Sequence, residues 1–304
     1  ASDVYKRQLE KAKAQDETEV FANDSKKKIY MHWMYDVPMG EQLDDDGDSL
    51  ESIEGCLTDA QYNRDEHRKA VIDDILDNWV SQSHNGKFHA ILATSSIPEA
   101  IKYYKLFAQR DCGLKTTAVF DPSDGNNESS IEKIDGIAQM LEDYNSLFGT
   151  CFNISGYASF KRDVCARLAH KTPYTAVENE PSKCLDILIV VDQMLTGYDS
   201  KWLNTLYMDK FYKWSNIEMI IQAFSRTNRV FNDDKPHGII RYYRRPYTMK
   251  NIIEYAFEQY SGQKPYGIFA AKLIQNLENM NAAFSDINDI FKIAGIPDFF
   301  KTSR

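Results

Sequence analysis

The fold is decided first by residues 88–107, FHAILATSSIPEAIKYYKLF, where an apolar run, three hydroxyl residues and a helical pattern follow one another. The run 88–93 is short and apolar, which predicts a buried strand, and Thr94-Ser95-Ser96 closes it. Ser96 and Glu99 match the S-x-x-E capping box, with Pro98 in the first turn, so a helix is expected to begin there. The stretch therefore predicts strand, turn and helix in succession.

The same alternation recurs along the chain. Further strands are predicted at 116–120, 185–191, 203–208 and 238–243, and further helices at 62–82, 131–141, 160–169 and 216–230. This order predicts an α/β fold with a parallel sheet flanked by helices, and only helical signals follow Thr248, including 269–291. Loops at the carboxyl ends of such strands gather ligand-facing groups. Residues 94–96, 192–199 and the start of the 216–230 helix are therefore expected to share one edge of the sheet.

Composition and charge bound the function. The 304 residues are 43% hydrophobic, which excludes global disorder. The net charge of -9 comes mainly from residues 1–60, which hold 15 acidic and 7 basic residues. Residues 201–250 instead hold 10 basic and 4 acidic residues, a local net +6 to which a polyanion is expected to dock. This stretch includes Arg226, Arg229, Arg241, Arg244 and Arg245.

The sequence does not support a metal site, a disulfide framework or a membrane-spanning helix. The five cysteines are widely spaced with no C-x-x-C pair, and the six histidines show no metal-ligand spacing. In the acidic run 44–48, Gly47 is fourth, whereas a calcium loop needs Gly sixth, so a solvated loop is expected. The longest aliphatic run, 187–191, is five residues against the roughly 20 of a membrane helix. We expect a soluble, cytoplasmic chain without a membrane partner.

The predicted helix 216–230 carries the residues of greatest interest. At 100° per residue, Gln222, Arg226 and Arg229 form one stripe. The opposite stripe is apolar and consists of Ile217, Ile220, Ile221 and Phe224. An ordinary solvated helix face has the same pattern. The alternative is that two guanidiniums and an amide project together from a rigid element toward a ligand.

Two motifs decide between these interpretations. Residues 222–229, QAFSRTNR, resemble the final motif of superfamily 2 helicases, Q-x-x-G-R-x-x-R, and residues 192–199, DQMLTGYD, resemble the preceding strand-linked T-G-x-D motif. With residues 203–210, LNTLYMDK, the set resembles the motor (R) subunit of type I restriction enzymes, in which Ser at position 225 is usual. The resemblance covers about 87–245. It implies a second RecA-like domain at 86–245, a lead-in segment at 1–85 with an acidic loop and one helix, and a small all-helical extension at 246–304.

The resemblance also implies roles for individual residues. Arg229 would be the arginine finger, with Arg226 as its phosphate-contacting companion. The nucleotide-binding candidates are Gln222, Gly197 and Asp199, for which a purely structural role is the alternative. The DNA-binding candidates are Ser95, Ser96 and Thr196, which would contact backbone phosphates, although Ser96 also caps a helix.

The function implied is that of one motor domain of an ATP-dependent DNA translocase in a restriction-modification system. ATP and Mg²⁺ would be held mainly by a separate P-loop domain, because the one Gly-Lys pair here, Gly86-Lys87, has Ser81 where the leading Gly belongs. This chain alone is expected to bind no cofactor and to hydrolyse nothing. The implied partners are double-stranded DNA, the preceding RecA-like domain, and methyltransferase and specificity subunits.

Three other readings stay open at this point. The chain can be a non-catalytic assembly module whose basic face and C-terminal helices bind partner subunits. It can belong to a superfamily 2 helicase or remodeller unrelated to restriction. A nuclease triad of Asp209, Asp233 and Lys235 is the weakest alternative, because the last two lie in a polar loop and not on a strand.

Overall fold

The computed structural model describes residues 2–44, 46–110, 112–120, 130–191, 198–231, 234–261, 280–285, 287 and 290–292. The chain divides into two compact units, Ala1–Ala256 and Phe257–Arg304. None of the helices in these ranges is both long and apolar enough to cross a lipid bilayer.

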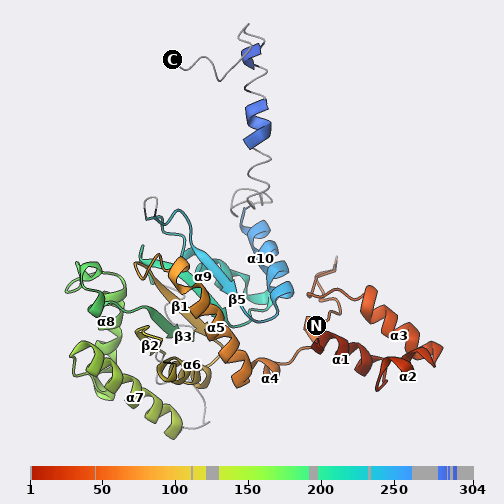
Figure 1. Ribbon diagram of the computed structural model, residues 1–304, viewed down its shortest axis with the longest axis horizontal. Coiled ribbons are helices and arrows are strands. Elements are labelled where there is room, and N and C mark those ends of the chain that lie inside the picture. The colour runs from red at the N-terminus through yellow and green to blue at the C-terminus, as the bar shows by residue number, and fades with distance from the viewer. Residues whose placement is uncertain are drawn as a thin grey trace. The chain divides into compact units, whose positions relative to one another are not determined.

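A five-stranded, all-parallel sheet forms the centre of the first unit (Figure 1). Its strands are β1 (His89–Thr94), β2 (Thr116–Val119), β3 (Ile187–Val190), β4 (Leu203–Asp209) and β5 (Ile239–Tyr242). Their order is β2-β3-β1-β4-β5, so β1 is the central strand. Every residue of β1, β3 and β4 is buried, as expected for strands covered on both faces. The predicted α/β fold with a parallel, RecA-like sheet flanked by helices is confirmed.

Helices flank this sheet and connect its strands. The main ones are α5 (Asp65–Gln82), α6 (Ile97–Gln109), α7 (Ser130–Phe148), α8 (Tyr157–Leu168), α9 (Ile217–Ser225) and α10 (Pro246–Ser261). Helix α6 packs against β1, β2 and β3, and α5 packs against β4 and α6. In the predicted stretch 269–291, the described residues 280–285, 287, 290 and 291 are helical, and the remainder lies outside the described residues.

The first turn of α6 differs in one respect from the predicted capping box. Ser96 is the N-cap residue, and its side chain accepts a hydrogen bond from the backbone N–H of Glu99. The Glu99 carboxylate does not bond back to Ser96, because both of its oxygens accept hydrogen bonds from Arg68 of α5, each at 2.7 Å. Tertiary pairing with a buried guanidinium therefore replaces the second half of the capping box.

The segment before the sheet contains more structure than the single helix predicted for residues 1–85. Besides α5 it holds α1 (Ser2–Lys11), α2 (Glu17–Phe21), α3 (Asp24–Tyr35) and α4 (Asp59–Tyr62). The Glu54 carboxylate accepts hydrogen bonds from the backbone N–H groups of Tyr247 and Thr248, at 3.1 and 2.7 Å. These are unpaired donors at the start of α10, where a negative charge is favoured. The segment thus caps the helix that follows the last strand.

Candidate functional site

Helix α9 ends earlier than its sequence pattern predicts. The expected helix extended to residue 230, but α9 stops at Ser225, and Arg226, Thr227 and Asn228 continue only with i→i+3 backbone bonds. Ser225 Oγ donates to the Gln222 carbonyl and Thr227 Oγ1 donates to the Phe224 carbonyl. Such local side-chain bonds compete with the α-helical ladder. Arg229 therefore lies beyond the helix, and the predicted stripe of three residues does not exist as a helix face.

A close backbone contact fixes the turn that replaces the end of the helix. Thr227 is buried, and a Cβ atom added at Gly238 would lie 2.3 Å from Thr227 Oγ1. Only glycine allows the segment before β5 to approach Thr227 this closely. The turn that carries Arg226 and Arg229 is therefore packed against the rigid entry to a strand.

Both arginines nevertheless reach the motif at residues 192–199. Arg226 Nη1 donates to the Tyr198 carbonyl at 3.2 Å, and Arg229 Nη2 forms an ion pair with Asp199 Oδ2 at 2.8 Å. The Arg229 and Asp199 side chains are 62% and 53% exposed. The predicted site residues Asp199, Arg226 and Arg229 thus come together at one place. Gln222 is exposed on α9 and is not part of this group. Gly197 and Thr196 lie outside the described residues.

These residues lie at the amino edge of the sheet, which corrects the expectation of one shared carboxyl edge. The Tyr198 hydroxyl is hydrogen-bonded to Nε2 of His89, the first residue of β1, at 3.1 Å. Burial lowers the pKa of His89 well below its ordinary value, so this imidazole is neutral at physiological pH. The physical reason for the placement is topological. The chain must return to the amino edge before Leu203, because β4 is parallel to β1 and β3.

Ser95 and Ser96 lie at the opposite, carboxyl edge, as predicted. Thr94 is level with Asp209 at the ends of β1 and β4, and both serines follow directly. Ser95 is exposed, while Ser96 is half-buried in its capping role. The start of α9 also follows β4 at this edge. Of the predicted site residues that the structure describes, Asp199, Arg226 and Arg229 lie at the amino edge, and Ser95 and Ser96 lie at the carboxyl edge. We define the amino-edge site as these first three residues together with Tyr198 and Lys235, which contact them.

A buried ionic cluster beneath the carboxyl edge was missed by the sequence analysis. Asp209 is 0% exposed and receives a bidentate pair of hydrogen bonds from Arg244, at 3.0 and 2.9 Å. His67 Nε2 contacts Asp209 Oδ1 at 2.7 Å, and the Tyr103 hydroxyl donates to Oδ2 at 2.9 Å. Burial alone would raise the pKa of Asp209, but the hydrogen bonds from His67 and Arg244 outweigh it and hold the pKa below its ordinary value. A carboxylate at the end of a predicted strand was the available signal.

The same cluster bears on two earlier expectations. Arg244 is 2% exposed and satisfied by Asp209, so this part of the basic stretch is not available to a polyanion. The alternative nuclease triad is also excluded in its predicted form, because Asp209 lies at the carboxyl edge whereas Lys235 contacts Arg229 and Lys201 at the amino edge. Asp233 lies outside the described residues.

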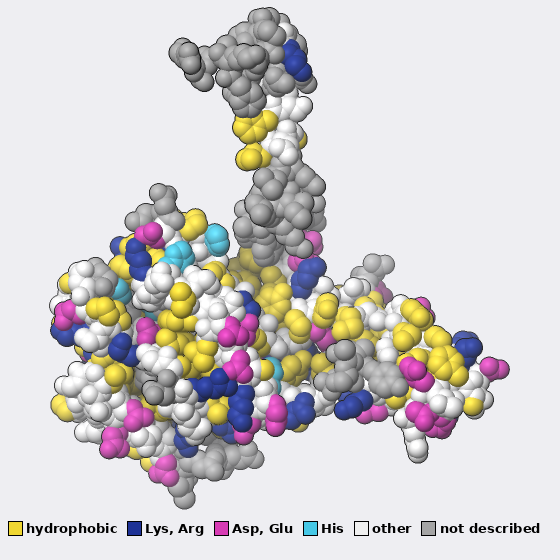
Figure 2. Space-filling model, in the orientation of Figure 1, with side chains coloured by type: hydrophobic (Ala, Val, Ile, Leu, Met, Phe, Trp, Pro, Cys, Tyr) yellow, Lys and Arg dark blue, Asp and Glu magenta, His cyan; other side chains and the backbone are white. Residues whose placement is uncertain are grey.

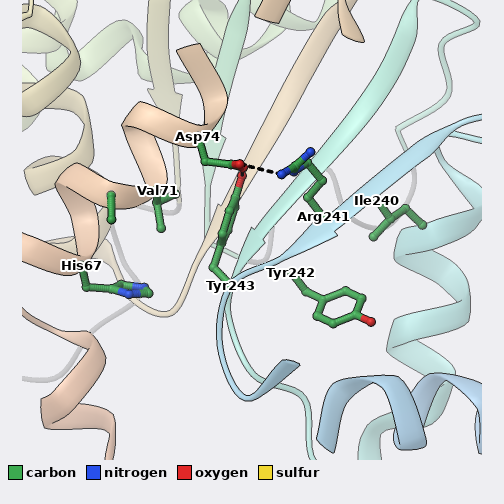
Figure 3. Close-up of a pocket in the computed structure, with 8 residues that line it drawn as sticks. His67, Val71, Asp74, Ile240, Arg241, Tyr242 and Tyr243 are labelled. Carbon is green, nitrogen blue, oxygen red and sulfur yellow. Dashed lines mark hydrogen bonds and ion pairs between the residues drawn. The ribbon is translucent and has the colours of Figure 1, made fainter. Parts of the chain in front are cut away.

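Arg241 of the basic stretch is likewise engaged. Figure 3 shows Asp74 of α5 between Arg241 and Tyr243, beside β5, in a cavity of about 600 Å³ that His67 also lines. Asp74 pairs with the Arg241 guanidinium at 2.5 Å and accepts a hydrogen bond from the Tyr243 hydroxyl at 2.8 Å. On the visible face in Figure 2, Lys and Arg side chains are interspersed with Asp and Glu side chains. Arg241 and Arg244 of the basic stretch are therefore each compensated by an aspartate within the fold.

Comparison of the sequence with known protein families identifies the family of this chain. A family model described as "Type I restriction enzyme subunit R domain 3" matches residues 86–245. The chain belongs to this type I restriction enzyme R-subunit family. This membership favours restriction over the alternative of an unrelated superfamily 2 helicase.

Individual R-subunit relatives agree with this assignment. The Type I restriction enzyme SsaAORF53P endonuclease subunit of Staphylococcus saprophyticus is 32% identical over 213 residues, 67% of this chain and 22% of the relative. The SauMRSORF196P endonuclease subunit of Staphylococcus aureus is 31% identical over 200 residues, 63% of this chain and 20% of the relative. The HindI endonuclease subunit of Haemophilus influenzae is 42% identical over 60 residues, 19% and 5% of the two chains. This R-subunit chain thus spans about a fifth of the length of the first two relatives.

Proposed function

We propose that this chain is the second RecA-like motor domain of an ATP-dependent DNA translocase, and that it supplies Arg229 as the arginine finger. The observation that carries the proposal is the exposed Arg229–Asp199 ion pair. It joins the two helicase-like motifs, which lie about 30 residues apart in the sequence, at one edge of the sheet. Family membership supports the restriction context.

The chemistry requires a positioned cation that can exchange its partner. During phosphoryl transfer, negative charge spreads over the transferred group, and a fixed guanidinium stabilises it. An exposed ion pair contributes only about 0–1 kcal/mol, so a nucleotide phosphate can replace Asp199 at small cost. Arg226, held against the Tyr198 carbonyl at 3.2 Å, would contact an adjacent phosphate. Gln222 and Gly197 remain predicted nucleotide contacts.

Contacts to DNA are proposed at the other edge. Ser95 is exposed directly before α6, whose first-turn N–H groups favour an anion, and a backbone phosphate fits this position. Thr196 remains a predicted contact of the same kind. Nucleotide and DNA would then occupy opposite edges of one sheet. Backbone contacts carry no base specificity, which suits a translocase.

ATP and Mg²⁺ would be held mainly by a neighbouring P-loop domain, which this chain completes from across the cleft. The residues present fit the phosphate end of a nucleotide, because the exposed guanidinium of Arg229 and the half-buried one of Arg226 both lie at the amino edge. Bound Mg²⁺ would supply charge neutralisation on the phosphates. The proposed partners are double-stranded DNA, that preceding RecA-like domain, and methyltransferase and specificity subunits.

The test is Arg229→Ala in a full-length R subunit that carries this segment. We expect DNA-stimulated ATP hydrolysis to fall about 10³-fold or more, because an arginine finger contributes 10³–10⁵ in rate. The melting temperature should stay unchanged, since the lost ion pair is exposed. Arg110→Ala is the matched control, because Arg110 is also exposed and paired with an aspartate, Asp73, elsewhere on the domain.

Unchanged ATP turnover in Arg229→Ala would overturn the proposal. If that variant also lost assembly with its partner subunits, the alternative of a non-catalytic assembly module would be favoured. Full ATPase activity after deletion of residues 86–245 would point the same way.

A further inference from the structure

The amino-edge site contains a buried lysine that the proposed phosphate chemistry does not use. Lys235 is 0% exposed, and its Nζ donates to the Arg229 carbonyl at 2.7 Å and to the Lys201 carbonyl at 3.3 Å. Across the part of the chain that the structure describes, both hydrogen bonds of this ammonium go to backbone carbonyls and neither goes to a carboxylate.

Burying the Lys235 ammonium without a carboxylate costs free energy, so a role that only fills space does not explain it. A buried ammonium loses its hydration, and a carboxylate normally compensates the charge. Here burial lowers the pKa of Lys235 to about 8. A methionine would fill similar volume without that cost, but it would leave two carbonyls of irregular backbone without this donor. The ammonium is therefore best explained by the two acceptors it joins.

Those acceptors belong to the two segments that carry the exposed ion pair. Lys201 follows Asp199 by two residues, and the other carbonyl is that of Arg229 itself. Lys235 is in turn fixed by paired backbone bonds with Phe231, at 3.0 and 3.1 Å. One ammonium thus connects the end of the 192–199 motif to the end of the 222–229 motif, behind the Arg229–Asp199 surface.

We infer that Lys235 is a positioning residue, which holds the Arg229 backbone against the Asp199 segment so that the guanidinium is presented at a fixed place on the amino edge. The inference rests on the proposed function of Arg229. It assigns Lys235 no contact with the nucleotide. Misplacement of a catalytic group by about 1 Å can cost about 10²-fold in rate, so a backbone anchor of this kind is functionally significant.

The charge state of Lys235 gives a pH-dependent test of this role. A side chain that only fills space would produce no such pH dependence. His89 of β1 interacts electrostatically with Lys235 and also with His170. Asp234, the residue before Lys235, forms an ion pair with Lys87, and the residues whose carbonyls Lys235 joins are Lys201 and Arg229. His89 is neutral because it is buried. A neutral amine is a weaker donor than an ammonium. We therefore expect the anchor to weaken as pH rises through about 8.

The experiment compares Lys235→Met, Lys235→Arg and the control Lys201→Met in a full-length R subunit carrying this segment. Lys201 is a neighbouring exposed lysine whose carbonyl, not its side chain, is the acceptor. We expect Lys235→Met to lower kcat for ATP hydrolysis by about 10- to 100-fold with KM changed much less. Lys235→Arg should recover part of kcat, and Lys201→Met should resemble the natural chain. The natural chain should lose kcat as pH rises from 7.5 to 9, whereas Lys235→Arg should not, because arginine stays protonated.

A second measurement separates this inference from the proposed function. In the 304-residue chain, the side-chain Nε–H resonance of Arg229 should shift in Lys235→Met and with pH near 8, but not in Lys201→Met. If Arg229→Ala abolishes ATP turnover while Lys235→Met retains it and the resonance is unchanged, the positioning role is wrong and the proposed function stands. If Arg229→Ala retains turnover, the proposed function is wrong, and the Arg229 resonance alone then decides whether Lys235 positions Arg229. Should Lys235→Met fail to fold, a flat pH profile of the natural chain together with an Arg229 resonance that does not move with pH overturns the inference.

Discussion

The two edges of the sheet hold the same type of ion pair in opposite surroundings. At the carboxyl edge, Arg244 and Asp209 are 2% and 0% exposed, whereas at the amino edge Arg229 and Asp199 are 62% and 53% exposed. The buried pair is bidentate, and His67 and Tyr103 also contact its carboxylate, while the exposed pair is joined by the hydrogen bond from Arg229 Nη2 to Asp199 Oδ2. Burial, and not residue type, therefore separates a structural arginine from one available to a ligand.

This difference explains why sequence charge alone misleads. Both arginines fall in the same basic stretch, and a count of charges treats them alike. A buried ion pair cannot release its arginine without leaving a carboxylate uncompensated, but an exposed pair can exchange partners through solvent. Three measurements test whether the two ion pairs differ in this way.

The largest effect on stability is expected at the buried pair. Arg244→Met leaves Asp209 buried without its bidentate partner, which should lower the free energy of unfolding by about 3–5 kcal/mol. Urea denaturation of the 304-residue chain measures this change, with Arg229→Met as the matched control. A loss as small as that of the control would show that the two edges do not differ.

An intermediate effect is expected from the buried lysine as a function of pH. The pKa of Lys235 is about 8 in the folded chain, below the ordinary 10.5. Between these values the unfolded chain binds more protons, so stability rises with pH in this window, and the full cost is present below pH 8. Relative to Lys235→Met, the natural chain should gain about 2–3 kcal/mol between pH 8 and 10.5. Parallel unfolding curves at pH 7.5, 8.5 and 9.5 measure it, and a constant difference would contradict a lowered pKa.

The smallest effect is expected at the exposed pair. Asp199→Asn removes one charge of the pair, and because both side chains are more than half exposed, the free energy of unfolding should change by less than about 1 kcal/mol. Salt at 0.5 M should reduce even this difference. A loss comparable to that of Arg244→Met would mean that the amino-edge pair is structural and not exchangeable.

Strand β3 was predictable because it is an uninterrupted apolar run, as expected for a strand that is covered on both faces. Strands β2, β4 and β5 contain polar residues and were predicted from their place in the strand–helix alternation. The end of α9 was not predictable from the sequence. A helix wheel takes no account of the Ser225 and Thr227 side-chain bonds or of the tertiary contact between Thr227 and Gly238. Local pattern therefore located the elements, and long-range contacts set one of their boundaries.

The proximity of two predicted residues could be expected from the motifs, but their place on the sheet could not. The motifs named Asp199 and Arg229 as members of one site, and the structure joins them. They did not indicate the edge, because that depends on where the chain returns before Leu203. The contacts of Asp209 with His67, 142 residues away, and of Lys235 with two backbone carbonyls have no local signature, so they could not be found without the fold.

Strand β1 bears on how the proposed motor domain would move. It is the central strand, fully buried; its first residue, His89, contacts Tyr198 and its last precedes Ser95. Six residues at about 3.3 Å each give a stiff spacer of about 20 Å. If the proposed function holds, this spacer would keep the span between the proposed nucleotide end and the proposed DNA end constant during a turnover. A stroke along the duplex would then come from rotation of the whole lobe against its neighbour, with the sheet moving as one body.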